Sequence, residues 1–230
     1  MQINYAQINR IFGKPKKEQK TAPKITYQKL FWLFLIGSFV GVLLEGLFCL
    51  VRYGHWETHV TSVWGYYNIL YGVGAVLFYV ATVLLWNKNA IWRFVCIAIA
   101  ADILELGAGL LLEFGLNMRA WSYLNNFLNF RGHICFSMTL AWGAIGTAFS
   151  YVVPYIEKVF AKMQHKAWDI ACIILSVIIF IELIFTTICI IRWKLRHFGK
   201  QAITAFAKFL DKYYNDNFMK KRFCEWRFLE

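Results

Sequence analysis

The sequence lacks the short motifs that mark the commonest ATP-binding and hydrolytic sites. Its 230 residues contain neither a GxxxxGK[ST] phosphate-binding loop nor a GxSxG nucleophile turn. If the chain works with ATP, a separate subunit must therefore bind the nucleotide. None of the six cysteines forms a CxxC pair, and all but Cys224 lie within apolar runs. This pattern predicts small buried residues rather than metal ligands or a disulfide framework.

Lysine and arginine are absent from the middle of every long apolar run, although the chain carries 25 of them and a net charge of +12. Hydrophobic residues make up 59% of the sequence, and five runs approach the roughly 20 residues that cross about 30 Å of hydrocarbon. These predicted spans are residues 30–51, 67–86, 91–113, 134–153 and 170–191. A backbone in hydrocarbon has no water to bond, so each run should be helical. We therefore predict an all-α fold, a polytopic transmembrane bundle of about five helices within residues 30–191.

The two ends of the chain are rich in basic residues. We expect residues 1–29 to form a cytoplasmic arm, because placing the N-terminus inside puts most basic loop residues on the inner side. Five crossings would leave the basic tail, residues 192–230, outside, which opposes the same rule. The tail fits either an amphipathic helix on the membrane surface or a solvated extension. We assign the positive charge to the lipid bilayer of the cell membrane and not to nucleic acid, because no nucleic-acid motif accompanies it.

Five acidic residues lie inside the apolar runs, where charge is expensive and usually functional. They are Glu45, Asp102, Glu105, Glu113 and Glu182. At about 100° per residue, the three in the third run share one stripe of a helix, which should face the bundle or a water-filled cavity. With the N-terminus inside, all five fall at mid-depth or in the outer half of the bilayer.

The outer loops offer the counter-charges and hydrogen-bond donors that the runs lack. We predict one substrate-binding site in the outer half of the bundle, composed of Glu45, Asp102, Glu105, Glu113, Arg119, Trp121, Tyr123 and Arg131. Such a site would coordinate a cation, carry protons or hold a small solute, as a permease does. We expect no cofactor and no metal ion.

Two other functions stay open, although a non-enzymatic one is favoured. A membrane-embedded enzyme acting on lipid or envelope substrates could use Glu105 and His133 as acid and base, but no nucleophile is placed beside them. In a non-catalytic scaffold, the acids would serve only to form hydrogen bonds between helices. His55, Glu57 and His59 would point to one side of an extended segment and could bind a metal. Because their order differs from HExxH, we interpret them as exposed loop residues.

Glycines at helical spacing predict close contacts between helices. Gly37 and Gly41 precede Glu45 at intervals of four residues, and small residues at that spacing let another helix approach. The pairs Gly72 with Gly74, and Gly143 with Gly146, offer similar approach in the second and fourth runs. We interpret these glycines as packing positions.

An ordered set of short motifs carries a family resemblance. They are Ile36-Gly37-Ser38-Phe39-Val40-Gly41 with Glu45, Tyr71-Gly72-Val73-Gly74, Glu105, Glu113, Trp121-Ser122-Tyr123, Arg131-Gly132-His133-Ile134-Cys135, Trp142-Gly143, Pro154 and, in the tail, Leu210-Asp211-Lys212-Tyr213-Tyr214. From Phe34 to about Pro154 the chain resembles the putative ABC-transporter type IV (CmpB-type) family of bacterial membrane proteins.

By its motifs the chain resembles a diverged member of that family. Thr61-Ser62, Gly65-Tyr66 and Asn68-Ile69 replace the family's Arg-Gly, Gly-Pro and Pro, and Ser122 replaces an Asp. The resemblance implies a multi-pass membrane protein with a permease role. Because five helices make a small bundle for a transporter that acts alone, we also expect a homo-oligomer or a separate ATP-binding subunit.

Overall fold

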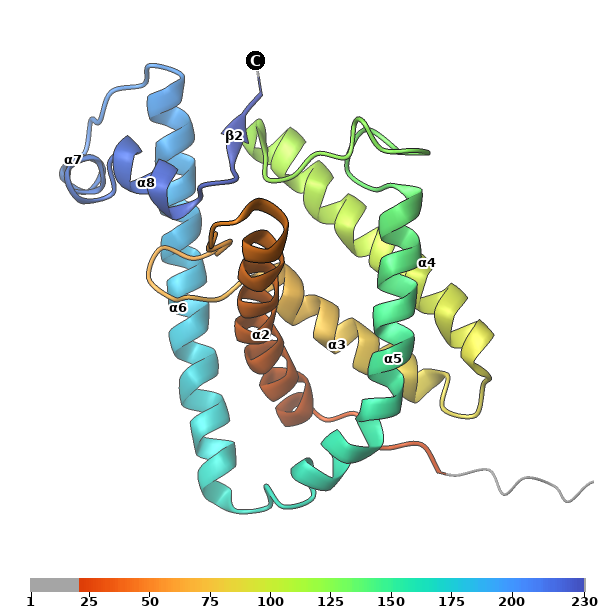
Figure 1. Cartoon of the computed structure of the whole chain (residues 1–230). Helices are drawn as coiled ribbons and strands as arrows, with labels where there is room; N and C mark the ends of the chain where they lie inside the picture. The colour runs from red at the N-terminus through yellow and green to blue at the C-terminus, as the bar shows by residue number, and fades with distance from the viewer. Residues whose placement is uncertain (1–20, 230) are drawn as a thin grey trace, which may run out of the picture.

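A computed structural model describes residues 21–229, which form a bundle of helices with one small sheet (Figure 1). Its elements are α2 (Tyr27–Tyr53), α3 (Ile69–Leu84), α4 (Ala90–Leu110), the π-helix η1 (Leu111–Leu116), β1 (Met118–Arg119), α5 (Phe136–Phe160), α6 (Lys166–His197), α7 (Ala205–Tyr213), α8 (Asp216–Arg222) and β2 (Arg227–Phe228). Strands β1 and β2 pair antiparallel. The predicted all-α class is confirmed. Most of the predicted N-terminal arm, residues 1–20, lies outside the described residues.

Four of the helices are long and apolar enough to cross a membrane: α2, α4 with η1, α5 and α6. The second predicted span, 67–86, is shorter than expected, because α3 has only 16 residues. At 1.5 Å per residue it reaches about 24 Å, less than the hydrocarbon thickness. The fourth predicted span is longer than expected, since α5 continues past Pro154 to Phe160.

Helix α3 is short because the segment before it runs down beside α2 without forming a helix. We call residues 54–68 the descending loop. Its last residue, Asn68, donates its backbone N–H to the carbonyl of Ser38 at 3.1 Å, and Ser38 lies in the middle of α2. The Asn68 side chain then caps α3 by accepting the N–H of Leu70 at 3.0 Å. The descending loop thus spans the part of the bundle, from the end of α2 to the start of α3, that a longer α3 would otherwise span. Non-helical backbone at such a depth must find its hydrogen bonds within the protein.

The predicted close approach of α2 and α3 is confirmed at three of the four glycines. A Cβ added at Gly41 would lie 2.2 Å from the Tyr71 ring, and one at Gly37 would lie 2.5 Å from the Ala75 methyl. Gly72 packs against Ser38 on the facing helix. The prediction is wrong for Gly74, which has nothing within 4 Å of an added Cβ. Gly72 and Gly74 are two residues apart, so they point about 200° apart on the helix.

Helices α4 and α5 also meet at glycines, as predicted. A Cβ at Gly143 would lie 2.8 Å from Phe94, and one at Gly146 would lie 2.2 Å from Ile97. The close contact fixes the faces that α4 and α5 present to each other. The acidic stripe of α4 therefore faces α5.

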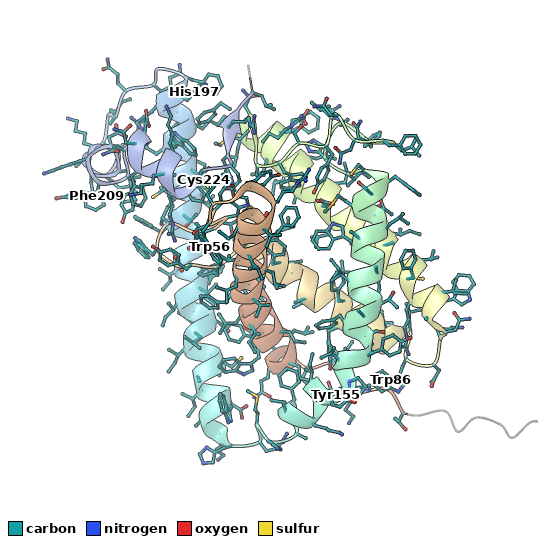
Figure 2. The ribbon with its side chains drawn as sticks, in the orientation of Figure 1. Trp56, Trp86, Tyr155, His197, Phe209 and Cys224 are labelled. Carbon is teal, nitrogen blue, oxygen red and sulfur yellow. The ribbon has the colours of Figure 1, made fainter. Side chains whose placement is uncertain are left out.

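The outer surface of the bundle is apolar, while its interior holds polar groups. Leu44 is 62% exposed, Ile103 67% and Phe180 64%, whereas Ser38, Thr82 and Thr186 are buried. Trp86 and Tyr155 lie near one end of the bundle, and His197 and Phe209 lie at the other (Figure 2). Exposed aliphatic side chains between aromatic ends are typical of a protein surrounded by lipid.

The tail packs onto the end of the bundle where α2 and α6 end (Figure 1). Leu210, Met219 and Phe223 are buried against Trp193 of α6 and Met118 of β1. This part of the tail is a packed lobe, and the solvated extension considered for it is wrong. Phe206, Phe209 and Tyr213 stay exposed on α7, so the membrane-surface interpretation stays a prediction for that face.

Removing the Asp211 carboxylate is expected to loosen this lobe. Asp211 receives two hydrogen bonds from Arg192, at 2.8 and 2.6 Å, and a third from Arg196 at 2.8 Å. These guanidinium contacts lower the pKa of Asp211. Asp211→Asn should therefore lower the free energy of unfolding by about 2 kcal/mol and speed tryptic cleavage at the lysines and arginines of the tail, beyond residue 197, several-fold. Asp216→Asn is the control, because Asp216 is half exposed and meets only Arg196. Equal cleavage rates in the two variants would contradict this anchoring role.

Candidate functional site

Glu113 lies on η1, where two arginines and a histidine from the loop of residues 117–135 surround it. It meets Arg119 Nη2 at 3.2 Å, His133 Nε2 at 2.6 Å and, closer still, Arg131 Nη2. We call these four residues the Glu113 cluster. His133 is 1% exposed, and its ring lies against Gly109, where an added Cβ would be 2.4 Å from Nδ1. The charge of Glu113 is therefore compensated within the protein.

The loop of residues 117–135 also reaches down to the next carboxylate on α4. Trp121 donates its indole N–H to the His133 carbonyl at 2.9 Å, which holds the two arms of the loop together. Tyr123 then donates its hydroxyl to Glu105 Oε1 at 2.8 Å, and Trp142 of α5 donates to Glu105 Oε2 at 3.1 Å. Glu105 is 5% exposed. Both of its oxygens are thus held by neutral donors.

Asp102 lies about one turn before Glu105 on the same face of α4. Thr139 of α5 donates to its Oδ2 at 2.7 Å, and its Oδ1 is buried without a hydrogen-bond partner among residues 21–229. None of the ion pairs among residues 21–229 includes Asp102 or Glu105. We call Asp102 and Glu105 the acidic pair. An uncompensated carboxyl in low dielectric must take up a proton or a cation, because its isolated charge is strongly disfavoured there.

Glu45 belongs to a different group. It accepts the hydroxyl proton of Tyr71, and His59 Nδ1 lies 2.8 Å from its Oε1. The Tyr71 ring lies 6.5 Å from the Trp142 ring, centroid to centroid, so these two aromatic side chains lie between Glu45 and Glu105. The Glu45 contact raises the pKa of His59 to about 9. At neutral pH, without a bound ion, the imidazole is therefore a cation held between carboxylates.

The residues predicted as one site therefore divide into three groups. Asp102, Glu105 and Tyr123 lie together, and Glu113, Arg119 and Arg131 form the cluster above them. Trp121 joins the arms of the loop, and Glu45 lies apart with His59. No hydrogen bond joins Glu105 to His133, so the acid–base pair considered for an enzyme is not formed within the described residues.

Glu182 is fastened to the descending loop. It accepts hydrogen bonds from the hydroxyls of Ser62 and Tyr67, each at 2.7 Å, and from the N–H groups of Trp64 at 3.1 Å and Gly65 at 2.6 Å. A carboxylate with four donors satisfies loop backbone that would otherwise be unpaired at this depth. Glu182 is thus a structural acid.

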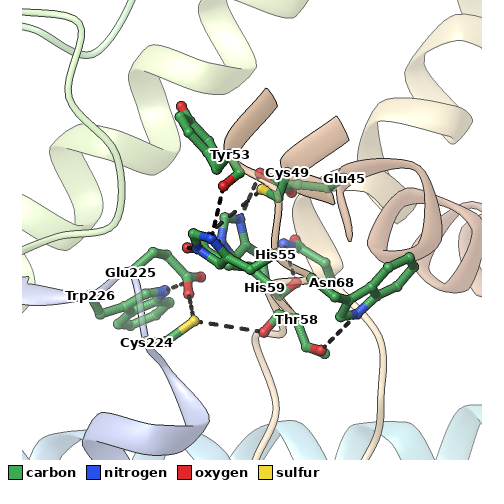
Figure 3. A network of polar contacts seen from close by, with 12 residues as sticks. Glu45, Cys49, Tyr53, His55, Thr58, His59, Asn68, Cys224, Glu225 and Trp226 are labelled. Carbon is green, nitrogen blue, oxygen red and sulfur yellow. Dashed lines mark hydrogen bonds and ion pairs between the residues drawn. The ribbon is translucent and has the colours of Figure 1, made fainter. Parts of the chain in front are cut away.

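Sequence reasoning missed several partners of these acids. Tyr71 and Trp142 stood out only as parts of family motifs, and Thr139 gave no signal. An aromatic or hydroxyl side chain in an apolar run has no pattern that assigns it to a particular acid. His59 and Glu57 did give one, through the alternation of His55, Glu57 and His59. His55 and His59 lower the pKa of Glu57. What the alternation could not predict is that Cys224 and Glu225, far along the chain, lie beside His59 (Figure 3).

An apolar-surfaced bundle with four helices of membrane length fits a multi-pass membrane protein. A family model described as "Putative ABC-transporter type IV" matches residues 32–187, more than half of the chain. The chain therefore belongs to this family, as the motifs predicted. No curated protein and no solved structure matches it.

Proposed function

We propose that the chain is a permease-like protein in which the acidic pair, Asp102 and Glu105, exchanges a proton or a small cation with the outer side of the membrane. One observation carries this proposal. The pair has no cationic partner among the described residues, and Asp102 Oδ1 is buried without any partner. An oxygen of this kind is either protonated or ready to bind a cation.

The side chains around the acidic pair can hydrogen-bond to a carboxyl group in either protonation state. The indole N–H of Trp142 can only donate, so its contact with Glu105 Oε2 holds for an ionised or a protonated carboxyl. The hydroxyls of Tyr123 and Thr139 can donate to a carboxylate or accept from a carboxylic acid. The pair can therefore gain or lose a proton while its neighbours remain hydrogen-bonded.

The proposal includes an orientation and partners. We place the N-terminus in the cytoplasm of the cell, so that the Glu113 cluster faces outside and closes the path above the acidic pair. A bundle with four membrane-length helices is small for a solitary transporter, which favours a homo-oligomer or a separate ATP-binding subunit. The family description supports the second arrangement.

The test is the thermal stability of the purified protein in detergent, scanned against pH, monovalent cations, Mg²⁺ and Ca²⁺. A ligand that binds only the folded state at 100 times its Kd stabilises by about 2.7 kcal/mol, so wild type should show a clear rise in Tm with one of them. Asp102→Asn/Glu105→Gln should lose that rise and stay folded. Asp169→Asn is the control, because Asp169 is an exposed acid at the start of α6.

The outcome separates the proposed functions. A shift in wild type and control that vanishes in the double variant supports an exchange site at the acidic pair. An unchanged shift in the double variant, or no shift under any condition, would overturn it. If no condition shifts the Tm and the double variant is simply less stable than wild type, the result favours the scaffold, in which the acids form hydrogen bonds between helices.

A further inference from the structure

Metal-ligating side chains from three distant segments meet beside the end of α2, away from the acidic pair. They are Cys49 of α2, Glu57 and His59 of the descending loop, and Cys224 and Glu225 after α8 (Figure 3). In each of two sets of three, Cys49–Glu57–His59 and His59–Cys224–Glu225, the ligand atoms all lie within 4.8 Å of one another. His59 belongs to both sets, so it is the centre of the group.

The spacing within the first set, Cys49–Glu57–His59, is close to that of a tetrahedral zinc site, and Cys224 of the second set would complete it by moving toward Cys49 and Glu57. Bonds of about 2.0–2.3 Å place neighbouring ligand atoms of a tetrahedron about 3.3–3.8 Å apart. Cys49 Sγ lies 3.9 Å from Glu57 Oε2, and His59 Nε2 lies 2.8 Å from the same oxygen. The second distance is that of a hydrogen bond and needs to open by about 0.5 Å to admit an ion. This is a small change for a side chain on a loop.

His59 is already oriented as a ligand. Its Nδ1 lies 2.8 Å from Glu45 Oε1, and Tyr71 in turn holds Glu45. A carboxylate on one imidazole nitrogen fixes the tautomer that offers the other nitrogen to a metal. Nε2 therefore points at Glu57. An arriving cation would replace the proton that His59 and Glu57 share.

We propose that Cys49, Glu57 and His59, joined by Cys224 from the second set as the ion binds, hold a zinc-class divalent cation, with Glu45 as the positioning residue behind His59. Thiolate and imidazole donors select zinc over magnesium or calcium, which prefer oxygen ligands. Cys49 is 2% exposed and Cys224 is exposed, so the site is built on a rigid helix and open on one side for the ion to enter. The ion would join α2, the descending loop and the tail. This proposal is independent of the acidic pair.

The test uses the full-length protein in detergent, stripped with a chelator and titrated with Zn²⁺ against a chromophoric competitor, then with Co²⁺. We expect one Zn²⁺ per chain and a thiolate-to-cobalt charge-transfer band in the near ultraviolet. Cys224→Ser should abolish the stoichiometric binding or weaken it at least about 100-fold, and Glu45→Gln should weaken it about 10- to 100-fold. Cys49→Ser should act like Cys224→Ser. Because Cys49 is buried, Cys224→Ser serves if the Cys49 variant does not fold.

Cys172→Ser is the matched control, because Cys172 is a buried cysteine of α6 that belongs to neither ligand set. It should bind Zn²⁺ like wild type, and so should the Asp102→Asn/Glu105→Gln variant. Failure of this proposal is therefore distinguishable from failure of the exchange site. Substoichiometric Zn²⁺, a cobalt spectrum without the thiolate band, or equal affinity in wild type and Cys224→Ser would overturn it.

Discussion

Glu182→Ala is expected to destabilise the protein more than any other single substitution of an intramembrane acid. The change leaves the Tyr67 hydroxyl and the Trp64 N–H without their acceptor. It also removes the Glu182 contacts of the Ser62 hydroxyl and the Gly65 N–H, which keep only their contacts with each other's residue. Each buried unsatisfied donor costs about 1–3 kcal/mol, and because these costs are not additive we expect about 3–5 kcal/mol in total. The descending loop should separate from α6 as a result.

The tail should respond to the same substitution. Arg222 of α8 donates to the carbonyls of Ser62 and Gly65, which belong to the turn that Glu182 holds. If this turn is released, Arg222 loses its partners, and the lobe built on α7 and α8 should become more accessible to protease. Thus one carboxylate in the middle of α6 supports both the loop and the tail.

Stability in mixed micelles against denaturant is the measurement for this prediction. Glu182→Gln keeps one acceptor oxygen and should lie between wild type and Glu182→Ala. Thr187→Ala is the control on the same helix, because Thr187 is exposed and bonds only to the Leu183 carbonyl. If Glu182→Ala were no less stable than Thr187→Ala, the loop would not depend on this acid.

Gly41→Ala is the second substitution with a large expected effect. Its Cβ would lie 2.2, 2.3 and 2.6 Å from three atoms of Tyr71, so the tyrosine must move away. Overpacking in a close contact costs typically about 1–3 kcal/mol. The displaced Tyr71 would also release Glu45, to which it donates its hydroxyl. We therefore expect a lower Tm and, in the same variant, weaker orientation of His59.

The same pair of helices provides the control for this prediction. Gly74→Ala adds its methyl group where nothing lies within 4 Å, and alanine favours a helix over glycine by up to about 1 kcal/mol. Its Tm should equal or exceed that of wild type. Two variants that change one hydrogen atom to a methyl group should thus shift Tm in opposite directions. A Gly41→Ala protein as stable as Gly74→Ala would mean that α2 and α3 are not in close contact.

Much of the fold could be predicted because it depends on local composition. An apolar run without basic residues has to be a helix in hydrocarbon, wherever its neighbours lie. Small residues at intervals of four, such as Gly37 and Gly41, imply a close helix contact by their spacing alone. The length of α3 could not be predicted in this way. Its run is apolar from Tyr67 to Trp86, but its start depends on where Asn68 meets Ser38.

The sequence indicated which residues could form the candidate site, but not which of them contact one another. Several acids lie inside apolar runs, where burying their charge costs free energy. This was sufficient to predict that they need partners from the outer loops. Which acid receives which partner depends on side-chain positions to within an ångström. Glu113 meets two arginines, whereas Glu105 on the same stripe meets only Tyr123 and Trp142.

The sequence by itself determined that this is a helical membrane protein of a particular family, with acids in the hydrocarbon and glycines at its helix contacts. These properties follow from hydrophobicity and spacing, which are local. Only the tertiary structure decided that Glu182 is fastened to a loop, that Asp102 keeps a free oxygen, and that Cys224 lies beside His59. Each of these joins residues far apart in the chain, and hydrogen-bond and ligand geometry is set only when the helices pack.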